Sequence, residues 1–467
     1  MKTNLNYHSE KLLADRINPI NIYLALRDQY QHCCLLESSD YQASNQAKSF
    51  IAINSIASFQ ASQNKVTLNY MGDEQLYQLK SLRDLPKDFE AFKTQLSERI
   101  NQGQAKSALF GYHSFEAYSY FEDLNIFRES SETPDFHYAL YEYILVFDHF
   151  NNELEIRYFY PESLSDADKE LNIQQLKTQI FSIPKPTFPF SAKGQEESNI
   201  SDNTFLKNVS EGIQSCKRGD VFQVVLSRCF RQAYQGDEFN LYRAMRSINP
   251  SPYLFYFDFG NFRLLGSSPE AALQLEDGKA SIYPIAGTVK RTGNDEEDSK
   301  LAERLAKDPK EQAEHMMLLD LARNDLSKSG NNICIEQQSK LQFFSHVIHL
   351  VSTVSAQVDP TTNVSELIAN TFPAGTLSGA PKFKAVEIIN RLENQARGFY
   401  GGSIGVIGLG KEINQAITIR SVLCKDGYLQ YQAGAGIVVK SNPQKELEEV
   451  KHKLGAVRAA IKMAENL

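Results

Sequence analysis

The chain of 467 residues contains no tryptophan and only six cysteines, although it has 22 tyrosines and 28 phenylalanines. The cysteines are scattered and none forms a CxxC pair: Cys33, Cys34, Cys216, Cys229, Cys334 and Cys424. This spacing excludes a disulfide framework and a cysteine-rich zinc site, and it is typical of reduced thiols inside a cell. We therefore expect a cytoplasmic protein. The absence of tryptophan excludes nothing by itself.

Signals for membrane insertion, secretion and nucleic-acid binding are also missing. No apolar run approaches the roughly 18 residues that a membrane span needs. The N-terminus MKTNLNYHSEKLL lacks the basic-then-apolar order of a signal peptide. The 57 acidic residues outnumber the 49 Lys and Arg residues, which gives a net charge of −8. Because phosphate binding needs a basic face, we expect no nucleic-acid partner, and we expect no membrane partner either.

The composition that remains is that of a globular protein, with 42% hydrophobic and 23% charged residues. The length predicts two or three domains, or one large composite. Three prolines followed by a polar stretch, in IPKPTFPFSAKGQEESNISD (183–202), are typical of a linker. We therefore predict an N-terminal region over 1–184, a linker over 185–200 and a second region over 201–467.

Short turn sequences between alternating apolar residues predict several β-hairpins. The predicted turns are Asn151-Asn152, Gly260-Asn261, Asp277-Gly278 and Asp426-Gly427. Helices are predicted over 309–326, over 381–392 and from 443 to the C-terminus, and each begins with proline. Because neighbouring hairpins form antiparallel sheet, this order predicts an α+β fold with helices packed on antiparallel sheets.

Two pairs of glutamates have the spacing that places both carboxylates on one helix face. Glu311 and Glu314 form the first pair, and Glu446 and Glu449 form the second. Two such pairs converging from two helices would make a hard oxygen-ligand site for Mg²⁺. Alternatively, Glu311 completes a capping box with Asp308, and acidic residues suit any helix N-terminus.

Single residues elsewhere allow a structural or a functional interpretation. His349, in SHVIHLVS, and Arg420, which ends AITIR, are each preceded by an apolar run. Arg420 would clamp a carboxylate if it points into a site, and otherwise it is a surface charge at a strand end. The glycines of QAGAG (432–436) allow backbone N–H groups to approach an anion, or merely allow close sheet packing.

Six longer strings occur together in the second region. They are YPIAGTVKRTG (283–293), DPKEQAEHMMLLDLARNDL (308–326), HLVSTV (349–354), FPAGTLSGAPK (372–382), YGGSIG (400–405) and QAGAGIVVKSNPQKELEEVKHK (432–453). These strings resemble the signature blocks of the chorismate-utilising enzymes, in the order of that family, and most closely those of its anthranilate-forming branch. The resemblance is dense over 200–467 and thinner over 1–60.

The resemblance implies a fold, a cofactor and a reaction. The family fold is a large two-part α/β sandwich of antiparallel sheets covered by helices, which agrees with the expected α+β class. The reaction uses Mg²⁺ and chorismate. Ammonia adds at C2 of the ring while the C4 hydroxyl leaves, and pyruvate is then eliminated to give anthranilate, the first step of tryptophan biosynthesis.

The resemblance also implies roles for individual residues. Glu314 and Glu449 match metal ligands, and Glu446 matches a more distant metal ligand. The implied catalytic residues are Glu311, as the acid that protonates the leaving hydroxyl, His349, associated with pyruvate elimination, Thr376 of TLSGAPK, and Lys453 near the metal. The implied substrate contacts are Gly287, Thr288, Tyr400, Arg420, Gly434, Ala435 and Gly436.

Two positions separate this chain from sister activities of the family. Aminodeoxychorismate synthases typically carry a nucleophilic lysine where this chain has Ala286. Isochorismate and salicylate synthases typically carry a lysine base where it has Gln223, and glutamine cannot act as that base. The alternatives are an aminodeoxychorismate synthase, or a non-catalytic regulator that binds chorismate or tryptophan. An intact set of glutamates at 311, 314 and 449 argues against a regulator.

The nitrogen source and an inhibitor are implied as well. No recognisable glutaminase motif is present, so the resemblance implies ammonia from a separate glutamine amidotransferase subunit in a hetero-oligomer. The segment LLESSDYQASNQAK (35–48) resembles the effector motif of the family, in which Glu37, Ser38 and Lys48 contact tryptophan. Pro252, Tyr253 and Leu254 resemble the other wall of that site, where an indole can pack. Alternatively, LLESS is a strand that ends in a polar turn.

Overall fold

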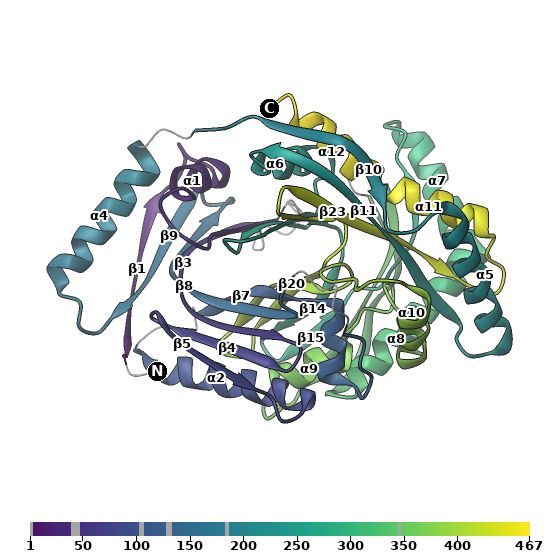
Figure 1. Cartoon of the computed structure of the whole chain (residues 1–467), viewed down its shortest axis with the longest axis horizontal. Coiled ribbons are helices and arrows are strands. Elements are labelled where there is room, and N and C mark those ends of the chain that lie inside the picture. Colours follow the sequence, from purple (N-terminus) through teal and green to yellow (C-terminus); the bar gives the residue numbers. More distant parts are fainter. Residues whose placement is uncertain (1–2, 39–46, 102–106, 128–132, 183–185, 344–346) are drawn as a thin grey trace.

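The computed structural model describes residues 3–38, 47–101, 107–127, 133–182, 186–343 and 347–467. Within these ranges the chain is an α+β protein, in which a large curled antiparallel sheet forms two layers with helices outside them (Figure 1). Of the strand pairings described, only that of β1 with β6 is parallel. The predicted fold class is confirmed.

One layer contains strands from both ends of the chain. Its order is β6 (Ile100–Asn101), β1 (Leu5–Leu13), β9 (Glu153–Pro161), β8 (Phe136–Asp148), β3 (Lys48–Ser62), β2 (Cys34–Glu37), β12 (Tyr253–Asp258), β13 (Arg263–Ser268), β22 (Ser421–Lys425), β23 (Tyr428–Ile437), β11 (Gln223–Gly236) and β10 (Phe190–Ser198). The short β19 (Gly379–Ala380) pairs with the start of β11.

The other layer also joins early and late segments. Its order is β5 (Asp73–Gln78), β4 (Lys65–Tyr70), β3, β8, β7 (Ala108–His113), β20 (Ser403–Gly408), β21 (Ile413–Ile417), β14 (Ala271–Glu276), β15 (Lys279–Ile282), β18 (Val347–Val358) and β17 (Gly330–Phe343). The strand β16 (Ile285–Lys290) pairs with β18 beside β15.

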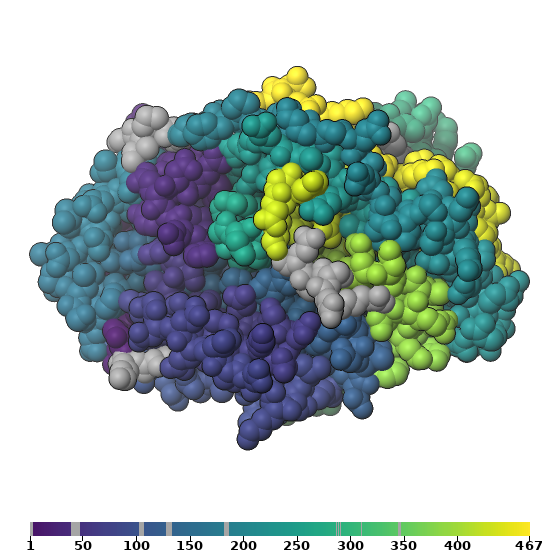
Figure 2. All heavy atoms as spheres, in the orientation of Figure 1, coloured from purple at the N-terminus to yellow at the C-terminus, as the bar shows by residue number. Residues whose placement is uncertain are grey.

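The two long strands β3 and β8 belong to both layers. The first half of β3 pairs with β2 and its second half pairs with β4. The first half of β8 pairs with β7 and its second half pairs with β9. Strands from before and after the predicted linker therefore pair in one continuous sheet, at β2–β12 in one layer and at β7–β20 in the other, and β10 lies within that linker. On the face shown in Figure 2, purple, teal and yellow segments accordingly lie against one another.

Helices lie outside the two layers (Figure 1). They are α1 (Pro19–Leu26), α2 (Leu85–Arg99), α3 (Tyr118–Phe121), α4 (Asp166–Ser182), α5 (Asp202–Arg218), α6 (Phe239–Ile248), α7 (Asp295–Lys307), α8 (Pro309–Ser327), α9 (Val364–Thr371), α10 (Lys382–Leu392), α11 (Pro443–Lys453) and α12 (Gly455–Ala464), with the 3-10 turns Leu82–Asp84 and Phe115–Ala117. No described helix is both long and apolar enough to cross a bilayer.

The helix starts follow the capping residues of the sequence. Asn442 accepts hydrogen bonds from the backbone N–H groups of Gln444 and Lys445, so it caps α11. The predicted helix from 443 to the C-terminus is wrong in one respect, because the chain turns at Leu454 and continues as α12.

Aromatic side chains pack helix α2 onto the sheet. Phe59 of β3 and Phe136 of β8 both pack against Phe89 of α2, with ring centroids 5.3 and 4.8 Å away. Tyr138 of β8 extends this cluster, and all four rings are buried. Edge-to-face pairs of this kind add to the free energy of burying the rings, so the cluster holds α2 against β3 and β8.

Candidate active site

The glycine-rich part of β23 forms one wall of the candidate site. Gly434, Ala435 and Gly436 pair with β11 in the antiparallel ladder. A Cβ atom on Gly434 would lie 3.1 Å from the Tyr400 hydroxyl, and one on Gly436 would lie 2.5 Å from Nε2 of Gln223. Both positions are therefore glycine because neighbouring polar side chains approach the backbone there. Tyr400 is buried, which raises the pKa of its hydroxyl.

Glu270, which precedes β14, is a buried carboxyl group that sequence reasoning missed. Its Oε1 accepts a hydrogen bond of 3.0 Å from the Thr376 hydroxyl. Burial raises the pKa of Glu270 to about 7, against the opposing effects of Thr376, Arg420 and Lys453. A carboxyl group with this pKa holds a proton at neutral pH about half of the time, so it can donate one to a bound molecule.

Arg420 lies close enough to Glu270 for their charges to interact. It follows β21 in the left-handed region, with φ +49°. Burial lowers the pKa of its guanidinium, and Glu270 opposes this effect. Its Nη1 donates to Oδ1 of Asn249 at 3.4 Å, a long contact. Arg420 is half-buried and positively charged, the kind of group that a carboxylate ligand needs.

Gly287 brings a third group of residues together at a bulge in β16. The bulge falls between Ala286 and Thr288, where β16 pairs with β18. A Cβ atom on Gly287 would lie 3.0 Å from Oε2 of Glu311, so the carboxylate of α8 lies against this glycine. Gly287 also has a φ of +64°, which favours glycine. The side chain of Thr288 is outside the described residues.

His349 of β18 contacts the carbonyl oxygen of the same glycine. The distance from Nδ1 to the Gly287 oxygen is 3.2 Å. Because a carbonyl only accepts hydrogen bonds, Nδ1 carries the proton in this contact. Burial lowers the pKa of His349 to about 4, and the nearby charge of Arg420 lowers it further. The imidazole is therefore neutral at pH 7. His315, in contrast, bonds to Ser352 inside the protein, which fits a structural role.

The helix α11 places charged groups at the end of the same strand. Nζ of Lys453 donates to the Gly434 oxygen at 2.9 Å and forms an ion pair with Glu449 at 2.8 Å. The charge of Glu449 also contributes to the raised pKa of Tyr400. Glu446 is buried, with 8% of its side chain exposed. Lys453, Glu449 and Tyr400 therefore lie around Gly434.

The acidic pairs fit Mg²⁺ in their chemistry, although they are not gathered into one cluster. Among the described residues no group of three or more His, Cys, Asp or Glu side chains could hold a metal ion. Glu311 and Glu314 lie on α8, and Glu446 and Glu449 lie on α11, at the same end of the molecule (Figure 1). Mg²⁺ needs only one or two carboxylates, and it completes its coordination with water and substrate oxygens. The donor set therefore suits Mg²⁺ bound together with an oxygen-rich ligand.

The two segments of the expected effector site are adjacent strands. Glu37 of β2 pairs with Leu254 of β12 in the sheet. Its buried carboxylate accepts a hydrogen bond of 2.6 Å from Tyr242 and forms an ion pair of 3.0 Å with Arg246. Sequence reasoning missed these two partners, which come from α6. Further along the chain, residues 39–46 of the expected motif lie outside the described residues.

The remaining residues of that expected site surround the same strand pair. Ser38 directly follows β2 and is half-buried, whereas Lys48 begins β3 and is exposed. Pro252 and Tyr253 are half-buried at the start of β12, and the Tyr253 hydroxyl accepts a hydrogen bond of 2.6 Å from Gln274. The geometry therefore provides an aromatic ring and a carboxylate on neighbouring strands.

Comparison with known proteins gives consistent matches over almost the whole chain. A family profile described as chorismate binding enzyme matches residues 31–459. The chain is 34% identical to anthranilate synthase component 1 of Acetivibrio thermocellus, covering 97% of this chain and 94% of that protein. It is 33% identical to the protein of that name from Thermus thermophilus, covering 98% of both chains.

Solved structures give the same result. Anthranilate synthase component I from Streptococcus pneumoniae aligns with a TM-score of 0.77 at 30% identity, covering 88% of this chain and 92% of that one. The menaquinone-specific isochorismate synthase from Escherichia coli has the same fold, with a TM-score of 0.77 at 19% identity over 98% of this chain and 95% of its own.

Proposed function

The chain belongs to the family of chorismate binding enzymes, and from this premise we propose that it is an anthranilate synthase that aminates chorismate with ammonia. The relatives named anthranilate synthase component 1 cover more than nine-tenths of this chain and support the proposal. The identities of Ala286 and Gln223 support it against the sister activities, because neither can act as the lysine that those reactions use.

The substrate would be held through its two carboxylates. Arg420 is a half-buried cation beside Glu270, and it can clamp one carboxylate with two parallel hydrogen bonds. Tyr400 and Gln223 lie against the backbone at Gly434 and Gly436, and Tyr400 can donate its hydroxyl proton to an anion there. Lys453 contributes a positive charge at the same strand end.

Loss of the C4 hydroxyl requires an acid, and the geometry favours Glu270. It is fully buried, its pKa lies near 7, and Thr376 fixes the orientation of its carboxyl group. These are the properties of an acid that donates a proton at neutral pH. The sequence predicts Glu311 for this role. Glu311 lies against Gly287 of β16, whereas Glu270 lies beside Thr376.

The elimination of pyruvate requires a base, and His349 is suitable. It is neutral at pH 7 because burial lowers its pKa to about 4. The hydrogen bond from Nδ1 to the Gly287 oxygen fixes the ring as the tautomer with its proton on Nδ1, so Nε2 is the nitrogen that can accept a proton. Its position next to the Gly287 bulge places it on the wall that also holds Glu311.

We propose that Mg²⁺ is held by Glu314 and Glu449, with Glu446 nearby. When bound, Mg²⁺ would neutralise the negative charge of a substrate carboxylate. Glu314 of α8 and Glu449 of α11 would supply charged oxygen ligands, and Lys453 would exchange its ion pair with Glu449 for a substrate contact.

The nitrogen would come from a separate glutamine amidotransferase subunit, so the working enzyme would be a hetero-oligomer. Tryptophan would inhibit it at the strand pair β2–β12, where Glu37 can pair an α-ammonium group and Tyr253 can pack an indole. Arg246 holds Glu37 in this structure, so tryptophan would have to displace an existing ion pair.

The test of the proposed activity is the fluorescence of anthranilate. We expect the purified chain to form anthranilate from chorismate, Mg²⁺ and ammonium salt, and to form none when glutamine replaces the ammonium salt. High pH should favour the reaction because NH₃ is the nucleophile. An amino-substituted product that keeps the enolpyruvyl group, as aminodeoxychorismate does, would overturn the proposal.

A further inference from the structure

The Thr376 hydroxyl, which orients the Glu270 carboxyl group, belongs to the loop 372–381 between α9 and α10. Within this loop the backbone N–H of Leu377 donates to the Ala374 oxygen at 3.0 Å, so the chain turns around Thr376. The hydroxyl at this turn donates to Oε1 of Glu270 at 3.0 Å. The position of the hydroxyl therefore depends on what holds the loop.

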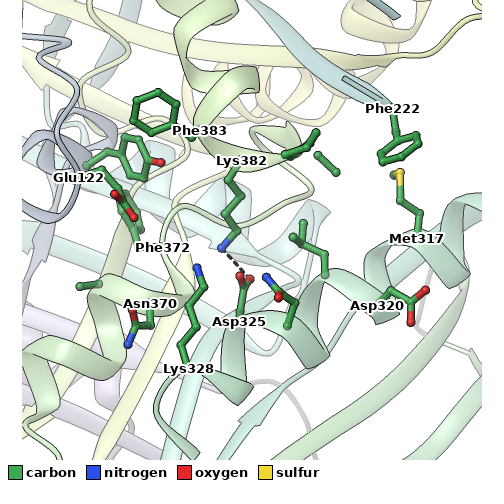
Figure 3. A pocket seen from close by; sticks show the side chains of 16 residues that line it. Glu122, Phe222, Met317, Asp320, Asp325, Lys328, Asn370, Phe372, Lys382 and Phe383 are labelled. Atoms are coloured by element: carbon green, nitrogen blue, oxygen red, sulfur yellow. Dashed lines mark ion pairs between the residues drawn. The ribbon is translucent and has the colours of Figure 1, made fainter. Parts of the chain in front are cut away.

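The two ends of this loop are joined by the ammonium group of Lys382, the first residue of α10. Its Nζ donates to the oxygen of Thr371, the last residue of α9, at 2.6 Å. The same Nζ forms an ion pair of 2.6 Å with Oδ2 of Asp325 on α8 (Figure 3). The side chains of Lys382 and Asp325 are only 10% and 5% exposed. One buried ammonium group therefore fixes both ends of the loop against α8.

Further contacts hold the loop on either side of Thr376. Gly375 packs so closely on α8 that a Cβ atom there would lie 2.2 Å from a methyl group of Leu321. On the other side, the Leu377 oxygen accepts a hydrogen bond of 2.7 Å from Nη1 of the buried Arg397. The loop is therefore clamped between α8 and Arg397, and the ion pair with α8 keeps the first of these contacts closed.

The ion pair itself lies outside the candidate active site. With Phe372 and Lys328 it lines a cavity of about 650 Å³ between the C-terminal half of α8 and the start of α10 (Figure 3). In the middle of the same loop, Thr376 bonds to Glu270 in the candidate active site. An effect of Lys382 on the reaction must therefore pass through the loop.

We propose that Lys382 is a positioning residue for the acid Glu270. By joining the ends of the loop 372–381, it holds the Thr376 hydroxyl at hydrogen-bond distance from the Glu270 carboxyl group. The inference rests on the proposed function, in which Glu270 protonates the leaving hydroxyl of the substrate. It adds a residue that contacts neither the substrate nor Glu270 and still determines how well the acid works.

This role has a signature in the titration of Glu270. The groups that face its carboxyl group are the Thr376 hydroxyl and the charges of Arg420 and Lys453, and each of them lowers its pKa against the effect of burial. The hydrogen bond from Thr376 does so because it stabilises the charged form. Without the Lys382 anchor this hydrogen bond would weaken, so the pKa of Glu270 would rise.

The test removes the ammonium group and follows anthranilate fluorescence across pH with ammonium salt. Lys382→Met is the first variant. The double variant Lys382→Met/Asp325→Asn leaves no unpaired charge in the interior, so the comparison does not depend on the single variant folding. Lys93→Met is the matched control, because the Lys93 side chain is 4% exposed and pairs with Glu90 on α2 at 3.4 Å.

We expect both Lys382 variants to lose about tenfold in kcat at low pH, because the acid is misplaced, with KM for chorismate within about twofold of that of the unaltered chain. The inflection in the rate per NH₃ molecule should move up by roughly one pH unit, the size expected when a hydrogen bond to a charged group is lost. Thr376→Val should move it in the same direction. Adding Lys382→Met to Thr376→Val should move it no further, whereas Lys93→Met should leave it in place.

Each other outcome separates this inference from the proposed function. An inflection that stays in place in both Lys382 variants would overturn the positioning role, even if both lose activity or stability. A further shift on top of Thr376→Val would overturn it too, because Lys382 would then act without Thr376. An equal shift in Lys93→Met would overturn it as well, since the loss of any buried ammonium group would then suffice. Absence of anthranilate formation by the unaltered chain would instead overturn the proposed function.

Discussion

At the residue scale, the buried carboxyl group of Glu270 leads to a direct prediction. Glu270→Gln keeps the shape and the contact with Thr376 but removes the acidic proton. General acids of this kind typically contribute about 10²–10⁴-fold to the rate. We expect kcat to fall by at least a hundredfold while KM for chorismate changes little, measured by anthranilate fluorescence. Glu276→Gln, an exposed residue at the end of β14, is the matched control.

The pH dependence of the same residue provides a second measurement. An acid must be protonated to work, and the pKa of Glu270 is about 7. The rate per NH₃ molecule should therefore fall as the pH rises through about 7. This inflection should be absent from the residual activity of Glu270→Gln. An unchanged inflection in that variant would assign the acid role elsewhere, with Glu311 as the next candidate.

The carboxylate of Glu449 leads to a prediction about the metal. Glu449→Gln removes one negative charge from the proposed Mg²⁺ site without changing its size. We expect the Mg²⁺ concentration needed for half-maximal activity to rise about tenfold, because a charged oxygen ligand becomes a neutral one. Glu448→Gln, on the same helix but paired with Lys451, should behave as the unaltered chain. Full activity of Glu449→Gln at limiting Mg²⁺ would exclude Glu449 as a ligand.

The sequence predicts some site residues but not Glu270, the buried carboxyl group with a raised pKa. The glycines of 434–436 and Arg420 occur in recognisable strings, and they lie around the candidate site. Glu270 is a lone carboxylate in SSPEAAL, with no patterned neighbour. Its pKa is set by burial and by groups such as Thr376 and Arg420, which come from distant segments. Such a property exists only after the chain has folded.

At the scale of elements, Arg397 joins segments from four parts of the sheet and its loops. Its guanidinium donates to both carboxylate oxygens of Glu393, to the Leu377 oxygen and to the Val225 oxygen, at 2.6–2.8 Å. Its backbone N–H donates to the buried Glu116, which follows β7. The same residue lies over the ring of Phe115, 4.5 Å from its centroid. Together these contacts of Arg397 hold the turn that carries Tyr400 in place.

We therefore expect Arg397→Met to be strongly destabilising. Removing one partner of a buried ion pair typically costs about 3–5 kcal/mol, because the remaining charge is left uncompensated. The measurement is the free energy of unfolding in urea. Arg391→Met, an exposed position on α10, should change it by less than about 0.5 kcal/mol. A loss of similar size in both variants would mean that the Arg397 network contributes nothing specific.

Local signals predict elements better than they predict partners. The turn pairs Asp277-Gly278 and Asp426-Gly427 lie between paired strands, β14–β15 and β22–β23, as predicted. The helix predicted over 309–326 is α8 (Pro309–Ser327). The pairing of β2 with β12, or of β7 with β20, has no local signal because it depends on which faces bury together.

At the scale of the whole molecule, strand β2 of the proposed tryptophan site is part of a continuous sheet. The strand β2 lies between β3 and β12, so tryptophan bound there would act on the sheet that also contains β13, β22 and β23. We expect tryptophan to inhibit anthranilate formation by the unaltered chain. Ser38→Phe should abolish inhibition with activity retained, because the ring fills the space, whereas Ser38→Ala should remain inhibited. Equal inhibition of all three proteins would exclude this location.

The pairing of β7 also has a consequence for how the protein is made. One edge of β7 is covered by β8, and the other is covered by β20, whose residues leave the ribosome roughly 290 positions later. Until then the early strands have an exposed edge that can pair with another chain. Complete folding must therefore follow the synthesis of β20. Until then, newly made chains would depend on a low concentration or on chaperones to avoid aggregation.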